Sequence, residues 1–161
     1  MARRNGEQQP TGTTSPGSAM SGRTGFRLIK LGELAMVTAE RALEPLGVRP
    51  RHFNVLATLA ADDTLSQQDV SRLLGIDPNV LVGVIDELEK QGLAERRRNP
   101  QDRRRHVVAL TDAGWQVLRD GAALLDEAEA AFFAEVPAAE LAVLHEVAAR
   151  LLARHPAPMK R

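Results

Sequence analysis

The chain has no cysteine among its 161 residues, which excludes disulfide bonds, thiolate metal sites and thiol-based redox sensing. It also has no apolar run as long as the roughly 18 residues that a membrane-spanning helix needs. The first 25 residues lack the apolar core of a secretory signal. They are rich in Gly, Ser, Thr and Pro, and we expect them to form a disordered tail of a cytoplasmic protein without a membrane partner.

Arrangements of catalytic or metal-binding residues are missing as well. The sequence contains no recognisable Ser-His-Asp constellation and no glycine-rich phosphate loop. Its four histidines, His52, His106, His145 and His155, do not have the spacing of metal ligands. We therefore expect a protein that is not an enzyme and that has no metal site and no cofactor.

The chain is marked instead by an uneven distribution of charge. Its formal net charge is +0, from 21 basic and 21 acidic residues. Residues 96–106 nevertheless contain six arginines and one acid, Asp102, which gives a local charge of +5. Residues 112–146 contain eight acids and one basic residue, Arg119, which gives −7. A basic segment in a neutral chain predicts a surface that meets phosphate.

Helical periodicity predicts four helices ahead of the basic segment. We expect them at residues 26–43, 51–61, 66–74 and 78–91. Ser66 and Asp69 form a capping-box pattern at the start of the third helix, and Gly75 permits the left-handed turn that ends it. Asp77 and Pro78 suit the start of the fourth helix. Two short helices joined in this way are typical of a helix-turn-helix, in which the second helix reads DNA.

A β-hairpin is predicted directly after the helix-turn-helix. Residues 93–98 and 105–110 read as strands around an Asn-Pro-Gln-Asp turn at 99–102. Val108 and Leu110 share one strand face and should pack on the reader helix. The predicted buried sides of the two helices are Val70, Leu73 and Leu74, and Leu81, Val84, Ile85 and Leu88. A helix-turn-helix followed by a hairpin indicates a winged helix.

Two further helices are predicted at residues 112–135 and 138–153, and Trp115 is expected in the core. Together with the first helix they carry more apolar surface than a small winged helix can cover, which favours a homodimer. The expected fold is mainly α with a small β-hairpin: a winged helix-turn-helix flanked by N- and C-terminal dimerisation helices. The expected divisions are a tail at 1–25, a dimerisation helix at 26–48, the DNA-binding domain at 49–111 and dimerisation helices at 112–161.

Several motifs carry a resemblance to a known family. They are Leu88-Glu89-Lys90-Gln91-Gly92-Leu93, then Arg96, Asn99-Pro100-Gln101-Asp102-Arg103-Arg104, and Leu110-Thr111-Asp112-Ala113-Gly114. With these motifs the sequence resembles the MarR (multiple antibiotic resistance regulator) family over residues 26–153. The resemblance implies a homodimer on a pseudo-palindromic operator in double-stranded DNA, with the reader helix in the major groove and the wing in the minor groove. It also implies repression of its own and a neighbouring gene, and in many members release by a small aromatic or phenolic effector.

The reader helix departs from the family pattern. Family members often carry Ser or Thr where this chain has Val80 and Val82, and a basic residue where it has Glu87. Valine can make only apolar contacts, for example with thymine methyl groups. We expect the mode of binding to be retained and leave the operator sequence open.

The candidate DNA contacts come from three segments. They are Ser66, Gln67 and Gln68, then Asn79, Val80, Val82 and Gly83, then Arg98, Asp102, Arg103 and Arg104. Asn79 has the chemistry to bind adenine, and Gly83 allows a close approach to the duplex. In the family's wing motif the residue matched by Arg104 enters the minor groove, and the one matched by Asp102 positions it. Alternative interpretations are a helix cap for Ser66, an exposed amide without a partner for Asn79, and a solubilising charge run for the arginines.

An effector pocket would lie where the family places it, between the DNA-binding part and the dimerisation helices. The candidate lining residues are Phe26, Lys30, His52 and Trp115. The alternative function is a winged-helix dimerisation or protein-docking module that does not bind DNA. The wing distinguishes the two functions, because a docking wing does not need six arginines.

Overall fold

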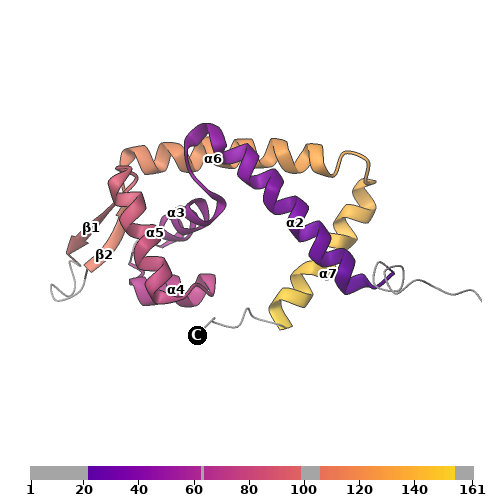
Figure 1. The fold of residues 1–161 in the computed structure, drawn as a ribbon, viewed down its shortest axis with the longest axis horizontal. Coiled ribbons are helices and arrows are strands. Elements are labelled where there is room, and N and C mark those ends of the chain that lie inside the picture. Colours follow the sequence, from indigo (N-terminus) through magenta and orange to yellow (C-terminus); the bar gives the residue numbers. More distant parts are fainter. Residues whose placement is uncertain (1–21, 63, 99–105, 155–161) are drawn as a thin grey trace, which may run out of the picture. The chain divides into compact units, whose positions relative to one another are not determined.

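A computed structural model describes residues 22–62, 64–98 and 106–154. The chain falls into two compact units, one up to Ala35 and the other from Met36 onwards. The elements are α2 (Thr24–Leu43), η1 (Glu44–Leu46), α3 (Pro50–Ala61), α4 (Gln67–Leu74), α5 (Pro78–Lys90), β1 (Ala94–Arg98), β2 (His106–Leu110), α6 (Asp112–Phe132) and α7 (Ala138–Arg154) (Figure 1). This mainly helical fold with a two-stranded hairpin confirms the predicted fold class. None of the helices described is long and apolar enough to cross a membrane.

Local side-chain chemistry sets the ends of α4 and α5. The predicted capping box is present, since Ser66 Oγ accepts from the Asp69 amide and Asp69 Oδ2 accepts from the Ser66 amide at 3.1 Å. Gly75 follows α4 with φ 62°, the left-handed conformation that glycine adopts without strain. Asp77 Oδ1 accepts from the amide of Asn79 at 2.8 Å and begins α5. The predicted helix-turn-helix is therefore confirmed.

The core of the second unit is built mainly from α3, α5 and the hairpin, with one side chain each from the end of α2 and from α4. Its fully buried side chains include Leu43, Val55, Leu56, Leu59, Val70, Leu81, Ile85, Leu88 and Val108. β1 and β2 are antiparallel, with Ala94 opposite Leu110 and Arg96 opposite Val108. Val108 and Leu110 belong to the same buried cluster as the α5 side chains, as predicted.

The predicted buried side of α4 is wrong in one position. Leu73 is 66% exposed, whereas Ser71 is buried. The Ser71 hydroxyl donates to the carbonyl of Ile76 at 2.6 Å, in the turn that follows the helix. This bond draws Ser71 to the buried side beside Val70, and Leu73 then lies outside it.

Two glycines let α6 approach the core closely. A Cβ on Gly114 would lie 2.0 Å from the carbonyl oxygen of Leu93, and one on Gly121 would lie 2.5 Å from Phe53 Cε2. Because Gly114 occupies the inward position, the next residue, Trp115, turns outward and is 41% exposed. The expectation that Trp115 lies in the core is wrong for this chain. The predicted end of this helix at residue 135 is also late, since α6 ends at Phe132.

Candidate nucleic-acid interface

The reader helix α5 has an exposed side that carries the predicted base contacts. Asn79, Val82 and Gly83 are exposed, with 40% of Val82 accessible. These residues are spaced three and four apart, so they lie on one side of the helix. Val80 is also exposed, and Val80 and Gly83 both line a cavity beside α3. All four predicted α5 contacts are therefore exposed, and Asn79 and Val82 are the two that do not line the cavity.

Gly83 is not required by the packing of its own chain. A Cβ built on this residue would meet nothing within 4 Å. Glycine inside a helix costs about 1 kcal/mol relative to alanine, because the unfolded chain loses more freedom on folding. Gly83 carries this cost on an exposed side of α5 with open space beside it. This combination supports the interpretation that another molecule approaches α5 at Gly83.

The start of α4 holds the second predicted group. Ser66 is engaged in the capping box, which is sufficient to explain its identity. Gln67 is half-buried and Gln68 is exposed, and the Gln68 carbonyl accepts from Arg72 Nε at 3.3 Å. Helix N-termini present backbone N–H groups and a partial positive charge, both of which suit a phosphate. A phosphate contact by these residues stays a prediction.

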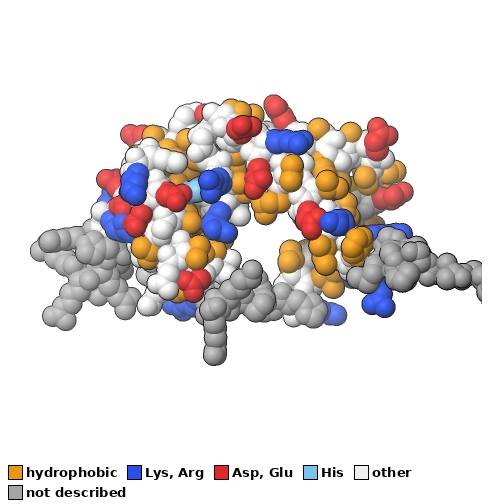
Figure 2. Space-filling view, viewed as in Figure 1, with side chains coloured by type: hydrophobic (Ala, Val, Ile, Leu, Met, Phe, Trp, Pro, Cys, Tyr) orange, Lys and Arg blue, Asp and Glu red, His pale blue; other side chains and the backbone are white. Residues whose placement is uncertain are grey.

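The arginines of β1 are not uniformly available to phosphate. Arg96 pairs with Asp86 and Glu89 of α5, and Arg97 pairs with Glu95. Figure 2 shows positive and negative side chains next to one another at the end that carries α5 and the hairpin. These acidic partners partly offset the positive charge that the sequence shows in this segment.

The remaining predicted wing contacts are only partly visible. Arg98 ends β1, where its backbone lies opposite His106 of β2. Asp102, Arg103 and Arg104 lie outside the described residues. Their assignment as DNA contacts therefore rests on the sequence alone.

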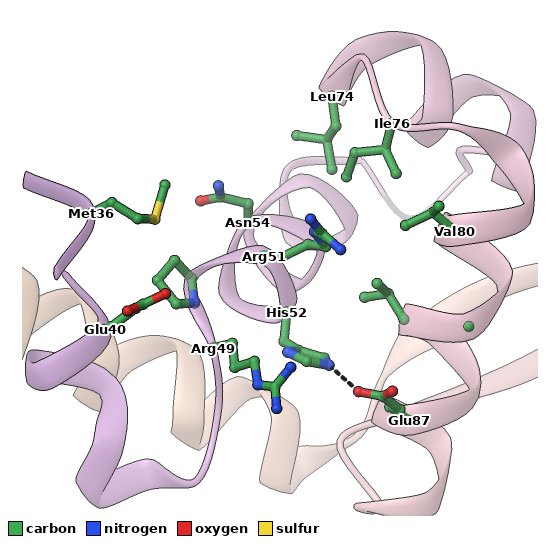
Figure 3. A pocket seen from close by; sticks show the side chains of 13 residues that line it. Met36, Glu40, Arg49, Arg51, His52, Asn54, Leu74, Ile76, Val80 and Glu87 are labelled. Carbon is green, nitrogen blue, oxygen red and sulfur yellow. Dashed lines mark hydrogen bonds and ion pairs between the residues drawn. The ribbon is translucent and has the colours of Figure 1, made fainter. Parts of the chain in front are cut away.

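A cavity of about 550 Å³ lies beside the reader helix, within the second unit (Figure 3). It is bounded by the end of α2, the start of α3 and the α4–α5 region. Its lining residues are Met36, Glu40, Arg49, Pro50, Arg51, His52, Asn54, Leu74, Ile76, Val80, Gly83, Val84 and Glu87. An apolar wall from α4–α5 thus faces a polar and basic wall at the start of α3.

His52 forms a hydrogen bond between the start of α3 and the reader helix α5. Its side chain is buried, and Nε2 lies 2.8 Å from Glu87 Oε2 (Figure 3). A carboxylate can only accept, so Nε2 is the donor. Nδ1 is buried and has no hydrogen-bond partner among the described residues. The pair spans 35 positions of sequence, and no sequence pattern indicates it.

The other predicted effector residues do not line this cavity of the second unit. Phe26 and Lys30 belong to the first unit, where Lys30 Nζ lies 2.7 Å from Glu33 Oε2 and 6.0 Å from the Phe26 ring centroid. Trp115 is not among the residues lining the cavity. Sequence reasoning missed Arg49 and Arg51. The run Arg49-Pro50-Arg51-His52 at a helix start was the signal that could have identified them.

A helix-turn-helix that continues directly into a two-stranded hairpin defines the winged-helix class. A model of the MarR family matches residues 46–105. The crystal structure of a MarR-family transcriptional regulator from Rhodococcus sp. RHA1 is 30% identical, with a TM-score of 0.73, and the match covers 83% of this chain and 94% of that one. The chain belongs to the MarR family.

Two further relatives extend the comparison. CouR from Rhodococcus jostii RHA1, in a crystal structure bound to p-coumaroyl-CoA, is 29% identical with a TM-score of 0.75, over 88% of this chain and 98% of that one. A putative transcriptional regulatory protein for the hcr operon of Thauera aromatica is 32% identical over 102 residues, which are 62% of this chain and 61% of that protein. The match thus spans less than two thirds of this curated relative's length.

Proposed function

We propose that the protein is a sequence-specific DNA-binding regulator of transcription, and that it acts as a repressor of its own and a neighbouring gene. The observation that carries this proposal is the exposed side of α5. This side carries Asn79, Val82 and Gly83. The chain continues from α5 into the β1–β2 hairpin, whose sequence is rich in arginine. Asn79 supplies an amide for adenine, and Val82 supplies a methyl surface for thymine. Positive charge comes from the wing, because Lys90 is the one basic residue of α5.

The regulator is proposed to be a homodimer. α7 contributes no buried residue, and most of its large apolar side chains are exposed. The exposed apolar residues of α7 are Val143, Leu144, Val147, Leu151 and Leu152. Leu144, Val147 and Leu151 have the spacing of one helix face, which a second copy would cover. Two-fold symmetry then implies an operator with two half-sites about 10 bp apart.

Selection from random duplex DNA with the full chain tests this function. We expect enrichment of a pseudo-palindrome, and an affinity for it that falls steeply with salt as counterions are released. The rival function, a winged helix that docks only to proteins, predicts no enriched sequence. An asymmetric selected site would contradict the dimeric arrangement while keeping the DNA-binding function.

We further propose that the cavity beside α5 binds an organic anion that controls release from DNA. Arg49 and Arg51 at the start of α3 provide positive charge, and the helix N-terminus adds a partial positive charge. Ile76, Val80 and Val84 provide the apolar wall. An aromatic or phenolic acid, or a larger acyl thioester such as the one bound by CouR, has this combination of chemistry.

Calorimetry with p-coumarate and p-coumaroyl-CoA as probes tests the effector site. We expect binding of at least one probe to the wild-type protein and a large loss of affinity in Arg51→Glu, which reverses a charge in the cavity lining. A ligand shifts the DNA equilibrium only through unequal affinity for the two states. Binding of the probe with equal affinity in the presence and absence of operator would therefore contradict an effector role.

A further inference from the structure

Arg96 of β1 is held by two carboxylates of α5. Its Nη2 donates to Asp86 Oδ1 at 2.7 Å, and its Nη1 donates to Glu89 Oε2. The backbone amide of Arg96 donates to the other Glu89 oxygen, Oε1, at 2.9 Å. Three hydrogen bonds thus join one residue of the hairpin to two residues of the reader helix. These three residues are called the Arg96 cluster below.

The geometry of the Arg96 cluster fixes an orientation as well as a contact. Asp86 and Glu89 are three residues apart, so their carboxylates lie on one side of α5. The guanidinium presents its donors in a rigid planar fork, and the additional bond to the backbone amide holds the strand itself. On β2, Val108 lies opposite Arg96 and is 1% exposed. At this level the hairpin is therefore held by core packing through Val108 and by charge through Arg96.

Stability alone does not account well for the Arg96 cluster. The side chains of Arg96, Asp86 and Glu89 are 30%, 46% and 28% exposed. Ion pairs with this much access to water contribute little to folding. Two carboxylates on a helix that faces phosphates also oppose binding. Asp86 and Glu89 are better explained by their hydrogen bonds to Arg96, which restrain the position of the hairpin.

We infer that Arg96 is a positioning residue for DNA recognition, because Asp86 and Glu89 hold the β1–β2 hairpin at a fixed angle to α5. The angle sets the distance between the bases read by α5 and the flanking base pairs that the hairpin reaches. Arg96 itself contacts no phosphate, since Nη1 and Nη2 point to α5. This inference rests on the proposed DNA-binding function. It adds the contact that fixes the position of the hairpin relative to α5, so that both can reach their base pairs at once.

The double variant Asp86→Asn, Glu89→Gln, called the carboxamide variant below, separates a positioning role from an electrostatic one. It preserves side-chain size and removes two negative charges near the DNA. The amide oxygens can still accept, but their bonds to the guanidinium lose the assistance of charge and about half of their strength. If the acids only repel phosphate, the variant binds the selected operator more tightly. If they position the hairpin, we expect roughly tenfold weaker binding, about the size of one lost groove contact. Hydroxyl-radical protection should then disappear at the operator flanks and remain over the bases read by α5.

A matched control comes from the same strand. Glu95→Gln also removes one acid from the hairpin, but it releases Arg97, whose partner does not lie on α5. We expect its protection pattern to equal that of the wild type. Thermal unfolding of each variant is measured in parallel. A general loss of folding lowers protection over the whole operator, whereas loss of positioning removes it at the flanks alone.

A double-mutant cycle completes the test. Arg96→Ala should weaken operator binding, as the carboxamide variant does. A protein that carries all three substitutions should bind the operator no more weakly than Arg96→Ala or the carboxamide variant, because each of these proteins has lost the same cluster. Opposite effects, with Arg96→Ala weaker and the carboxamide variant tighter, would overturn the inference. If the wild type protects no duplex, both the proposed function and the inference are wrong. If it gives a footprint that Arg96→Ala and the carboxamide variant both reproduce, the inference alone is wrong.

Discussion

His52 on α3 and Glu87 on the reader helix are joined by a hydrogen bond of 2.8 Å between Nε2 and Oε2. The His52 side chain is 7% exposed and that of Glu87 is 59% exposed. The buried His52 therefore restrains the position of the surface residue Glu87. Both line the cavity, next to Arg49 and Arg51 (Figure 3). A ligand in this cavity would lie beside the bond that connects α3 to α5, which supports an effect of the ligand on the reader helix.

Glu87→Ala should lower the free energy of unfolding by about 1 kcal/mol, because it leaves the buried His52 Nε2 without its acceptor. Glu87→Gln should restore most of this loss, since its amide oxygen can still accept from Nε2. Urea unfolding of the three proteins measures the difference. Equal stability of the Ala and Gln variants would show that the bond does not hold the two helices together.

Gly83→Ala should change stability and DNA binding in opposite directions. Alanine has open space at this position, so we expect the free energy of unfolding to rise by up to about 1 kcal/mol. The added methyl group stands on the side of α5 that is proposed to approach DNA, so operator affinity should fall severalfold. Thermal unfolding and an operator titration measure the two effects.

Gly121→Ala is the control for this pair of effects. Its Cβ would lie 2.5 Å from Phe53 Cε2, and the resulting overpacking should destabilise the chain by about 1–3 kcal/mol. If Gly83→Ala were also destabilising, the glycine would serve the fold of the chain. The interpretation of Gly83 as a site of close DNA approach would then lose its support.

Features that depend on neighbouring residues could be predicted from the sequence. The capping box of Ser66 and Asp69 and the left-handed Gly75 are set within a single helical turn, and both are confirmed. The two antiparallel strands are also confirmed, because strand alternation is a local signal, while the predicted turn at 99–102 lies outside the described residues. The family resemblance supported the same arrangement on the scale of the whole chain.

Features that depend on how elements pack could not be predicted. Leu73 and Trp115 have the spacing of core residues, but Ser71 and Gly114 occupy the inward positions. The bonds from Arg96 to Asp86 and from His52 to Glu87 connect different elements, and only the folded chain brings these residues together. The run of arginines therefore indicated a basic wing, but it did not show that Arg96 forms hydrogen bonds with Asp86 and Glu89 of α5.

Val147→Glu should convert the proposed homodimer into a monomer. Leu144, Val147 and Leu151 are 38%, 38% and 46% exposed, and they share one side of α7. Burying a charge in a dimer interface is unfavourable, so light scattering at micromolar concentration should give the monomer mass. Ala149→Glu adds the same charge on the opposite side of α7 and should leave the dimer intact. Monomeric wild-type protein, or a dimer that survives Val147→Glu, would contradict this interface.

Arg104→Ala should weaken operator binding by roughly 1–3 kcal/mol and make the salt dependence shallower by about one unit. Arg104 lies outside the described residues, and the expectation rests on the wing motif of the sequence. A narrow A·T-rich minor groove concentrates negative potential, and an arginine inserted there gains from it. The measurement is a titration of the selected operator at several salt concentrations.

Asp102→Ala tests two opposed effects at the same wing. If net charge alone decides affinity, removing an acid near phosphate tightens binding. If Asp102 positions Arg104, its removal weakens binding although the protein becomes more positive. We expect weakening, with the largest loss on operators whose flanks are A·T-rich, because those flanks reward a correctly placed arginine most. Tighter binding by Asp102→Ala at every salt concentration would show that the wing acts through its net charge and that Asp102 does not position Arg104.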